Sequence, residues 1–205
     1  LGAPKLYDYI RAYGFGSPSG IELPGESRGL LRRLENWSPI SIGAISMGQE
    51  VGVTPVQMIN AISAIANGGL LYRPQVVLGF KPETPGPAMP RIEPTRVVRE
   101  TTAASMRHML EGVVLGGTGR LARLDGYTSA GKTGTAQKLD PGTGRYSQTQ
   151  LIASFVGFAP VNNPAVSILV QLDSPVGPHE GGSVAAPVFK RVAEQVLAYL
   201  NVAQD

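Results

Sequence analysis

Residues 129–137 combine small and hydroxyl side chains with a single lysine, and no other stretch of the chain offers as much chemistry. They read Ser-Ala-Gly-Lys-Thr-Gly-Thr-Ala-Gln, so glycines stand on both sides of Lys132. Glycines in a strand leave room for another backbone to lie alongside. Threonine hydroxyls beside an ammonium group can hold a carboxylate or an amide by charge-assisted hydrogen bonds. Because short motifs also match by accident, the rest of the chain has to support this interpretation.

The composition indicates a globular protein with a real core. The chain has 205 residues, of which 42% are hydrophobic and 16% are charged, and this suits one large domain or two small ones. No run of about 18 apolar residues occurs, so we expect a soluble chain without a membrane span. Residues 1–11 look like a helix entered midway, and we expect that the chain does not begin at a natural N-terminus.

Several kinds of site are disfavoured by residue usage. Cysteine is absent, which excludes disulfides, zinc-thiolate sites and cysteine nucleophiles. The two histidines, His108 and His179, are far apart and lack metal-ligand spacing, so we expect neither a metal nor another cofactor. The net charge is +3, but the basic residues are scattered along the chain, and we expect no nucleic-acid partner.

The first 125 residues are predicted to be mainly helical. The clearest helix begins at Thr54-Pro55, because threonine is a good N-cap and proline suits the first helical position, and it ends at 67–69, which read Asn-Gly-Gly. The other expected elements are a helix over 4–13, a short extended piece over 20–26 turning at Pro24-Gly25, an irregular stretch over 28–52, a strand-like run over 70–80, a proline-rich linker over 81–90, and a helix capped by Thr101 or Thr102 that ends at 116–119. The expected buried stripes are Met58, Ile62 and Ile65, widened by Ile59 and Ala66, and then Met106, Leu110 and Val113.

From residue 126 onward the hydrophobic period becomes extended. Three strands are predicted over 126–137, 151–159 and 165–172, and the short connection 160–164 favours an antiparallel hairpin. A helix over 188–200 follows, with Pro187 in its first turn and Phe189, Val192, Val196, Tyr199 and Leu200 on one side. This order predicts an α+β fold, in which helices flank an antiparallel sheet. A three-stranded sheet that ends at the Lys132 strand looks incomplete.

A Lys-Thr-Gly strand is one of three signatures of certain serine acyl-transferases, together with Ser-x-x-K and Ser-x-Asn. The letters of Ser-x-x-K occur at Ser129 to Lys132, but that lysine already belongs to the strand motif. A nucleophile pair of this kind also needs a helix, where residues three apart share a face, and Gly131 in an extended run argues against one. Ser129 is therefore rejected as the nucleophile, and no Ser-x-Asn occurs in the chain.

Eight motifs, the Lys-Thr-Gly stretch among them, run in order over nearly the whole chain. They give the sequence a close resemblance to the class B penicillin-binding proteins, the transpeptidases of bacterial cell-wall synthesis of the division and elongation type. They are Tyr13-Gly14-Phe15-Gly16, Gly20-Ile21-Glu22-Leu23-Pro24-Gly25-Glu26, Met47-Gly48-Gln49 with Val53-Thr54-Pro55-Val56-Gln57, Ala64-Ile65-Ala66-Asn67-Gly68-Gly69, Gly117-Thr118-Gly119, residues 130–137, Ser154-Phe155-Val156-Gly157-Phe158-Ala159-Pro160, and Ala185-Ala186-Pro187-Val188-Phe189. Together they are far more specific than the lysine motif alone.

The resemblance implies a β-lactamase/transpeptidase-like fold, of which residues 1–205 form the C-terminal portion. Residues 1–125 would be the mainly helical part and residues 126–205 the sheet strands and the last helix. The chain would begin just after the Ser-x-Asn motif, so the nucleophilic serine and its lysine would lie in an upstream segment or a companion chain. We expect the isolated chain to be inactive.

The resemblance also implies a substrate and a place of action. The substrate would be the D-Ala-D-Ala end of a peptidoglycan stem peptide, and β-lactam antibiotics would mimic it. The other partners would be the remainder of the transpeptidase domain and the cell-wall synthesis machinery. The protein would act on the extracytoplasmic face of the cytoplasmic membrane, anchored by an upstream segment.

Five residues of this chain match the family's site motif. By resemblance, Lys132 supplies positive charge beside the catalytic serine, and the Thr133 hydroxyl contacts the terminal carboxylate of the substrate. Gly134 lets the substrate backbone lie close, and the backbone N–H of Thr135 is one of two oxyanion-hole donors. Gln137 shares the strand face of Thr135 by the period of two and could touch the substrate, although a plain surface glutamine fits the pattern equally well.

Two alternatives remain open from the sequence. A D,D-carboxypeptidase or a β-lactamase would hydrolyse the acyl-enzyme; class A β-lactamases carry a Glu with an Asn four residues later, and no Glu before Lys132 has that partner. A non-catalytic penicillin sensor or scaffold would use the same glycine and threonine pattern for binding alone. Residues upstream of Leu1 would discriminate between an enzyme and a binding module.

Overall fold

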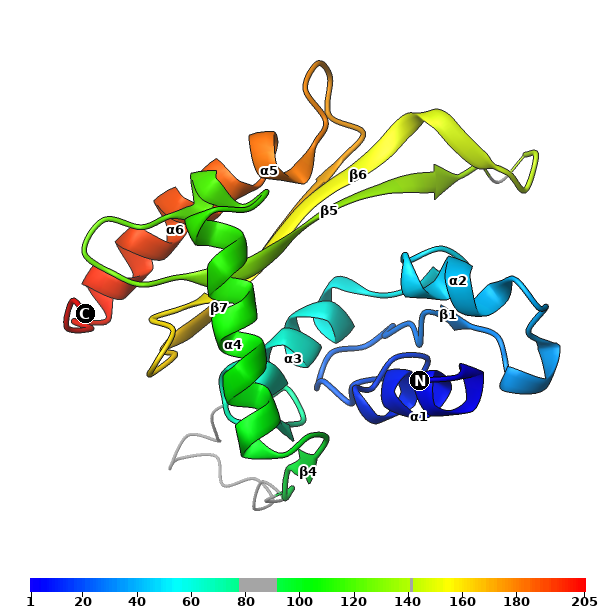
Figure 1. Ribbon diagram of the computed structural model, residues 1–205, viewed down its shortest axis with the longest axis horizontal. Coiled ribbons are helices and arrows are strands. Elements are labelled where there is room, and N and C mark those ends of the chain that lie inside the picture. The colour runs from blue at the N-terminus through cyan, green and yellow to red at the C-terminus, as the bar shows by residue number, and fades with distance from the viewer. Residues whose placement is uncertain (78–91, 141) are drawn as a thin grey trace, which may run out of the picture. The chain divides into compact units, whose positions relative to one another are not determined.

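The computed structural model describes residues 1–77, 92–140 and 142–205 (Figure 1). The predicted linker over 81–90 lies outside these residues, as does the end of the predicted run over 70–80. The chain divides into two compact units, the first made of 1–64 and 69–99 and the second of 65–68 and 100–205. The prediction that 1–205 is part of a single transpeptidase domain stays a prediction.

The first unit contains short elements. Its helices and strands are α1 (Ala3–Ala12), β1 (Leu30–Leu31), the 3-10 helix η1 (Leu34–Asn36), α2 (Ser41–Ser46), β2 (Val51–Gly52), α3 (Pro55–Ala66), β3 (Leu70–Leu71) and β4 (Thr95–Arg96). Strand β1 pairs with β2 and β3 pairs with β4, both antiparallel. The helix predicted over 4–13 is confirmed. The prediction of an irregular stretch over 28–52 was wrong, because four short elements form there.

Helix α3 begins and ends as its sequence predicts. The Thr54 hydroxyl accepts from the backbone N–H of Gln57 at 3.1 Å, and the Gln57 side-chain oxygen accepts from the N–H of Thr54 at 2.9 Å, which is a reciprocal capping box. At the other end Gly69 N–H bonds to the Ala64 carbonyl at 2.7 Å. Of its predicted stripe, Ile62 and Ala66 are buried, whereas Met58, Ile59 and Ile65 are only half-buried.

The loop over 17–28 is held by side chains. The buried Gln57 amide donates to the carbonyls of Ser17 at 2.8 Å and Arg28 at 2.9 Å. The Glu26 carboxylate accepts from the backbone N–H groups of Ser19 and Gly20. No strand forms over the predicted extended piece 20–26, because polar side chains rather than a neighbouring strand satisfy this loop; the turn at 24–25 is confirmed.

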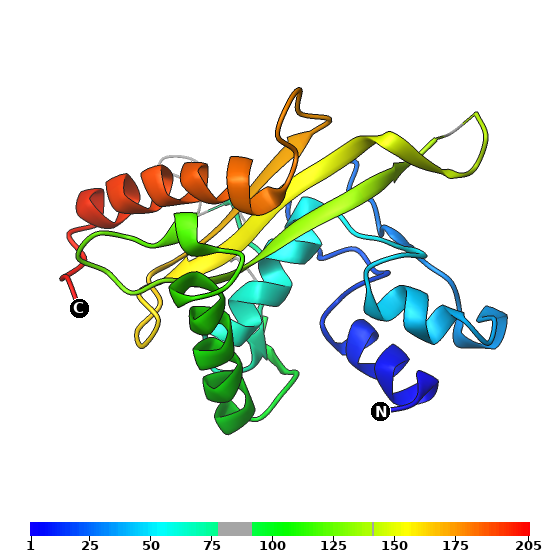
Figure 2. The same cartoon turned by 45° about the horizontal axis from the view of Figure 1, so that its top comes forward.

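The second unit is built on a three-stranded antiparallel sheet in the order β5-β6-β7. Its elements are α4 (Glu100–Leu115), the 3-10 helix η2 (Arg120–Ala122), β5 (Ala130–Leu139), β6 (Tyr146–Ala159), β7 (Val166–Asp173), α5 (Gly181–Val184) and α6 (Ala186–Tyr199). The three predicted strands, the hairpin over 160–164 and the last helix are confirmed. Figure 2 shows α6 running along the sheet. The short α5 is not predicted by the sequence.

Two predicted boundaries in this unit were wrong. Helix α4 begins at Glu100, so Thr101 and Thr102 lie inside its first turn and neither caps it, whereas the Glu100 carboxylate suits the positive end of the helix dipole. Strand β5 begins at Ala130 instead of 126, because Thr128 is bonded elsewhere: its N–H and hydroxyl donate to the Asp205 carboxylate at 2.7 and 2.6 Å.

The core of the second unit lies between the sheet and α6. Phe189 of α6 packs on Phe155 of β6 with ring centroids 4.8 Å apart. The buried positions of α6 recur every fourth residue after Phe189, at Ala193 and Leu197. Part of the predicted stripe is therefore wrong, because Val192, Tyr199 and Leu200 are exposed. The helix instead turns its alanine-containing face, with Ala186 and Ala193, into the core.

The remaining buried members of this core are Val114, Ala122, Leu124, Ala159 and Ala185. In α4, Leu110 is buried as predicted, but Val114 is more deeply buried than Val113.

Candidate active site

All five predicted site residues lie on β5, at one edge of the sheet (Figure 1). In register with β6, Lys132 stands opposite Val156, Gly134 opposite Ser154 and Thr135 opposite Ala153. Within the described part of the second unit, no strand pairs with the other edge of β5. An edge strand has unpaired backbone groups that can bind an extended peptide.

The hydroxyl groups of Thr118 and Thr133 and the ammonium of Lys132 form a cluster at the start of this strand. The Thr118 and Thr133 hydroxyl oxygens are 2.8 Å apart and share a hydrogen bond. Lys132 Nζ donates to the Thr133 carbonyl at 3.0 Å and lies 3.4 Å from the Thr133 hydroxyl. The exposed cluster therefore presents several donors next to one positive charge, which suits a carboxylate.

Thr118 is a further candidate site residue, and the sequence patterns do not predict it. It belongs to the Gly117-Thr118-Gly119 segment after α4, which the sequence marks only as a helix exit and a family motif. A Cβ on Gly117 would come within 2.9 Å of the Val113 backbone, so the chain turns too closely against α4 for a larger residue. The small residues on either side of a lone hydroxyl are the only signal that could have pointed to it.

Helix α5 approaches β5 through two glycines. A Cβ on Gly181 would collide with the carbonyls of Gly134 and Ser154, and a Cβ on Gly182 would collide with the Thr118 carbonyl. The Gly181 N–H donates to the Thr135 hydroxyl at 3.2 Å. The Thr135 side chain therefore fastens α5 to the strand.

The glycines of β5 differ in what they permit. A Cβ on Gly131 would lie 2.5 Å from the Val156 carbonyl oxygen and 2.6 Å from the Phe155 ring, so packing within the sheet requires this glycine. A Cβ on Gly134 would meet the Ser154 hydroxyl at 2.5 Å and nothing else within 3.5 Å. Because a serine side chain can rotate, the fold places a weaker demand on Gly134.

The structure supports the rejection of Ser129 as a nucleophile. Its side chain is buried, and its hydroxyl donates to the Ala122 carbonyl at 3.0 Å. Gln137 is half-buried and stands opposite Leu151, close to a register shift between Gln137 and Leu139.

The described ranges contain no group of three or more His, Asp or Glu side chains placed to hold a metal ion. Among the helices in the same ranges, none is both long enough and apolar enough to cross a membrane.

The sequence matches the family described as "Penicillin binding protein transpeptidase domain" over residues 1–194. It is 40% identical to Stage V sporulation protein D of Bacillus subtilis, over 98% of this chain and 32% of that protein. It is 36% identical to peptidoglycan D,D-transpeptidase FtsI of Escherichia coli, over 98% of this chain and 32% of that protein. The chain thus spans about a third of the length of these relatives.

Solved structures agree with the sequence comparison. The crystal structure of penicillin-binding protein 3 from Mycobacterium tuberculosis in complex with ampicillin superposes with a TM-score of 0.92 at 36% identity, covering 100% of this chain and 48% of that one. The apo transpeptidase domain of Burkholderia pseudomallei penicillin-binding protein 3 gives a TM-score of 0.86 at 33% identity, covering 100% and 60%.

These similarities confirm two predictions, the transpeptidase-like α+β fold and the resemblance to the class B proteins. The match extends from the first residue of the chain through most of α6, so both compact units take part in it. The chain belongs to the penicillin-binding protein transpeptidase domain family.

Proposed function

We propose that this chain forms one wall of the active site of a peptidoglycan D,D-transpeptidase. Such an enzyme cross-links stem peptides at D-Ala-D-Ala by serine acyl transfer and is acylated by β-lactams. The observation that carries the proposal is the cluster of Lys132, Thr133 and Thr118 at the edge of β5. The name of one relative, peptidoglycan D,D-transpeptidase FtsI, favours this function over hydrolysis or binding alone. The ampicillin complex of another relative supports a site that takes β-lactams.

Lys132 and Thr133 would hold the carboxylate of the substrate or of a β-lactam. The Thr118 hydroxyl fixes the Thr133 hydroxyl in place, because each is within hydrogen-bond distance of the other. A preorganised donor loses less entropy on binding than a freely rotating one. Thr118 therefore joins the predicted set as a residue that orients Thr133.

The backbone N–H of Thr135 would stabilise the oxyanion that forms during attack on the amide carbonyl. The Thr133 carbonyl accepts from Lys132 Nζ, which supports an orientation toward the free edge of β5. Residues of an antiparallel strand alternate in the direction of their backbone groups, so Thr135 would present its N–H to the same edge. A fixed donor of this kind contributes about 3 kcal/mol to transition-state stabilisation.

Gly134 and Gln137 would contact a substrate that lies along this edge. An extended peptide that pairs with β5 gains affinity from main-chain hydrogen bonds. The small Gly134 keeps the strand surface open to that peptide, and Gln137, on the same strand face as Thr135, would contact it further along.

The nucleophilic serine would come from the remainder of the transpeptidase domain, in an upstream segment or a companion chain. The other proposed partners are stem peptides, β-lactams and the cell-wall synthesis machinery. The proposed place of action is the outer face of the cytoplasmic membrane, since peptidoglycan lies outside the cytoplasm. An upstream anchoring segment is part of the same proposal and rests on the family resemblance alone.

The test compares this chain with the longer protein that contains it. After incubation with fluorescent penicillin, we expect covalent label on the longer protein and none on the isolated chain. A labelled serine within residues 1–205 would refute the proposed division of the site. Absence of label on the longer protein would refute the enzymatic proposal itself.

Substitutions in the longer protein test the role of Thr135. Thr135→Ser keeps both the N–H and the hydroxyl that binds α5, so acylation should stay close to the original rate. Thr135→Pro removes the N–H and also the hydroxyl that accepts from Gly181, and an edge strand tolerates proline where the N–H faces outward. Thr135→Ala, which removes the hydroxyl alone, is the matched control. We expect Thr135→Pro to slow acylation about a hundredfold or more relative to Thr135→Ala. Equal loss in Thr135→Pro and Thr135→Ala would contradict the backbone role.

A second pair of variants tests whether Gly134 is needed for ligand binding or for packing within the sheet. Gly134→Ala would press on the Ser154 hydroxyl, whereas Gly134→Ala combined with Ser154→Ala relieves that contact. If Gly134 serves the ligand, acylation stays slow in the double variant although its thermal stability returns. Recovery of both acylation and stability would show that Gly134 serves only the sheet.

A further inference from the structure

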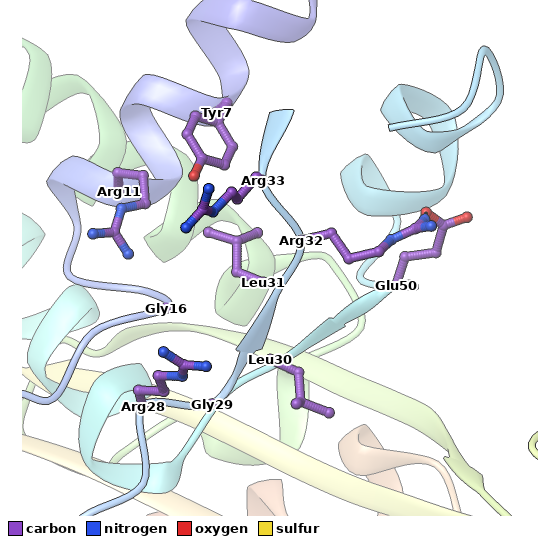
Figure 3. A pocket seen from close by; sticks show the side chains of 10 residues that line it. All are labelled: Tyr7, Arg11, Gly16, Arg28, Gly29, Leu30, Leu31, Arg32, Arg33 and Glu50. Carbon is purple, nitrogen blue, oxygen red and sulfur yellow. The ribbon is translucent and has the colours of Figure 1, made fainter. Parts of the chain in front are cut away.

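A cavity of about 480 Å³ lies in the first unit, between α1, Gly16 and β1 (Figure 3). Its volume is within the range of small-molecule sites. Helix α1 contributes Tyr7 and Arg11, which are four residues apart and so share one helix face. The Tyr7 ring is held edge-on against Trp37, with centroids 5.7 Å apart. The cavity contains none of the residues placed in the proposed active site.

Three arginines face this cavity from different sides. In Figure 3 the guanidinium groups of Arg11, Arg28 and Arg33 point into the space around Leu31, whereas Arg32 points the other way, toward Glu50. The direction of Arg28 depends on Gly29, whose φ of +70° interrupts the alternation of the strand. A Cβ at Gly29 would collide with the Gly52 carbonyl, so this backbone shape is built into the fold.

The charge of these three arginines is not balanced by the cavity wall. Glu50 is the one carboxylate in the lining, and it pairs with Arg32 and accepts from the Ser41 hydroxyl at 2.8 Å. Arg33 has only a surface contact with Glu35, at 3.7 Å. Such an exposed pair contributes little.

Arg11 uses one of its donors on the Phe15 carbonyl at 3.3 Å. Within residues 1–77, 92–140 and 142–205, no carboxylate lies within ion-pair distance of Arg11 or Arg28. A guanidinium has five N–H donors, so most of the donors of Arg11 and Arg28 remain available to a ligand.

We propose that this cavity binds a phosphate group. A carboxylate offers one planar edge and matches a single guanidinium fork, whereas a tetrahedral phosphate offers oxygens in several directions. The guanidinium groups of Arg11, Arg28 and Arg33 approach from different sides and therefore match a phosphate better than a carboxylate. Leu31 and the Tyr7 ring give the cavity an apolar wall, which suits a phosphate joined to an organic group.

Two sources could supply that phosphate. One is the headgroup of an anionic phospholipid, and the other is a soluble phosphorylated compound. Both use the same contacts, but only the first would bring the chain to a membrane surface. The experiment therefore needs separate arms for soluble phosphate and for lipid.

The first measurement is a titration of the isotope-labelled chain, followed by backbone amide NMR. The probes are inorganic phosphate, pyrophosphate and succinate, each at low ionic strength, because salt screens exposed charges. We expect saturable shifts at the amides of Gly16 and Gly29 with the phosphates, and at least about fivefold weaker binding of succinate. No saturable shift with either phosphate would overturn the proposal, and so would equal binding of succinate.

The lipid arm uses flotation with vesicles. Binding to phosphatidylglycerol vesicles but not to phosphatidylcholine vesicles, competed by pyrophosphate, would assign the site to a lipid headgroup. Binding of soluble phosphate without flotation would assign it to a soluble compound. Flotation that pyrophosphate does not compete, together with absent phosphate shifts, would count against the cavity.

Variants locate the site. Arg11→Gln and Arg28→Gln should each weaken pyrophosphate binding by roughly threefold to tenfold, a loss set by one charge-assisted hydrogen bond at an exposed position. Arg28→Lys keeps the charge but loses the fork, and should fall between Arg28→Gln and the original chain.

The matched control is Arg191→Gln, an exposed arginine of α6 in the second unit, which lowers the net charge by the same amount. An equal loss in Arg191→Gln would mean that overall charge, and not this cavity, attracts the anion. Unchanged unfolding midpoints would show that the variants fold. The measurement uses no penicillin, so it can fail or succeed independently of the proposed transpeptidase function.

Discussion

Strands in the first unit are two residues long where the structure describes them, whereas β6 in the second unit runs over 14 residues. The first unit is fastened by polar side chains that bond to loop backbone, with Gln57 and Glu26 as the centres. The second unit is fastened by its sheet and by an apolar core around Phe155 and Phe189. We therefore expect loss of a polar side chain to weaken mainly the first unit and loss of a buried aromatic ring to weaken mainly the second.

The comparison also bears on where chemistry can be placed. The long strand β5 holds Lys132, Thr133 and Thr135 at fixed spacing, in register with β6. In the first unit the cavity lining comes from a helix and from a strand flanked by loops, and the side chains of Arg11 and Arg33 each make a single polar contact within the described residues. Sites on regular elements are held more tightly than sites on loops.

The largest effect is expected from the apolar core. Phe189→Ala removes a fully buried ring and should lower the free energy of unfolding of the second unit by about 3–5 kcal/mol. Val192→Ala, on the exposed side of the same helix, should cost much less. Denaturant unfolding measures both. Similar losses would mean that α6 is not the main apolar contact of the sheet.

The next effect concerns the polar centre of the first unit. Gln57→Ala leaves the carbonyls of Ser17 and Arg28 without their donor and the Thr54 N–H without its acceptor, and should destabilise this unit by about 2–3 kcal/mol. Hydrogen exchange should then rise over 17–28 but not in β6. The control is Asn60→Ala in the same helix, which removes a single exposed bond to the Tyr72 carbonyl. Equal exchange in the two variants would argue against Gln57 as a centre.

A smaller effect depends on pH. Burial by itself would raise the pKa of Glu26, but hydrogen bonds from Ser19 and Gly20 and the charge of Arg73 lower it below its ordinary value of 4.5. A lowered pKa adds stability above the unfolded value, and this stability is lost as the pH falls below about 4.5. Glu26→Gln should therefore destabilise the first unit at pH 7 and reduce its acid sensitivity. Thermal unfolding at pH 7 and pH 3.5 measures this, and an unchanged pH dependence would contradict it.

The smallest effect is expected from an exposed ion pair on the sheet. Lys138 Nζ lies 2.7 Å from Asp173 Oδ1, and the hydrogen bonds from Lys138 and Ser174 lower the pKa of Asp173. The pair stabilises the fold above the unfolded pKa of about 3.9, and the gain disappears as the pH falls through the folded value. Asp173→Asn should lower the unfolding midpoint slightly at pH 7 and not at pH 2. Adding Lys138→Gln should cause little further loss; a second drop of equal size would show that the residues act separately.

The strands around the site could be predicted from local patterns, whereas the roles of the site residues rest on the family resemblance and stay predictions. Alternation and turn residues predict the Lys132 strand and the two strands that follow it. Motif spacing rules out Ser129 as the nucleophile. Thr118 could not be found in this way, because its meeting with Thr133 depends on how the segment after α4 folds back onto β5. The same holds for α5, whose four residues carry no helical period.

The sequence by itself determined the elements whose signals are local. The capping box and the glycine exit of α3, the three strands and the Lys-Thr-Gly motif are written in neighbouring residues, since caps, turns and side-chain periods act over a few positions. Only the tertiary structure decided which face of α6 is buried, that Gln57 holds a loop 29 to 40 residues away, and that Gly181 and Gly182 allow α5 to touch the site strand. Those features depend on close approach between distant segments, and side-chain volume in three dimensions sets that approach.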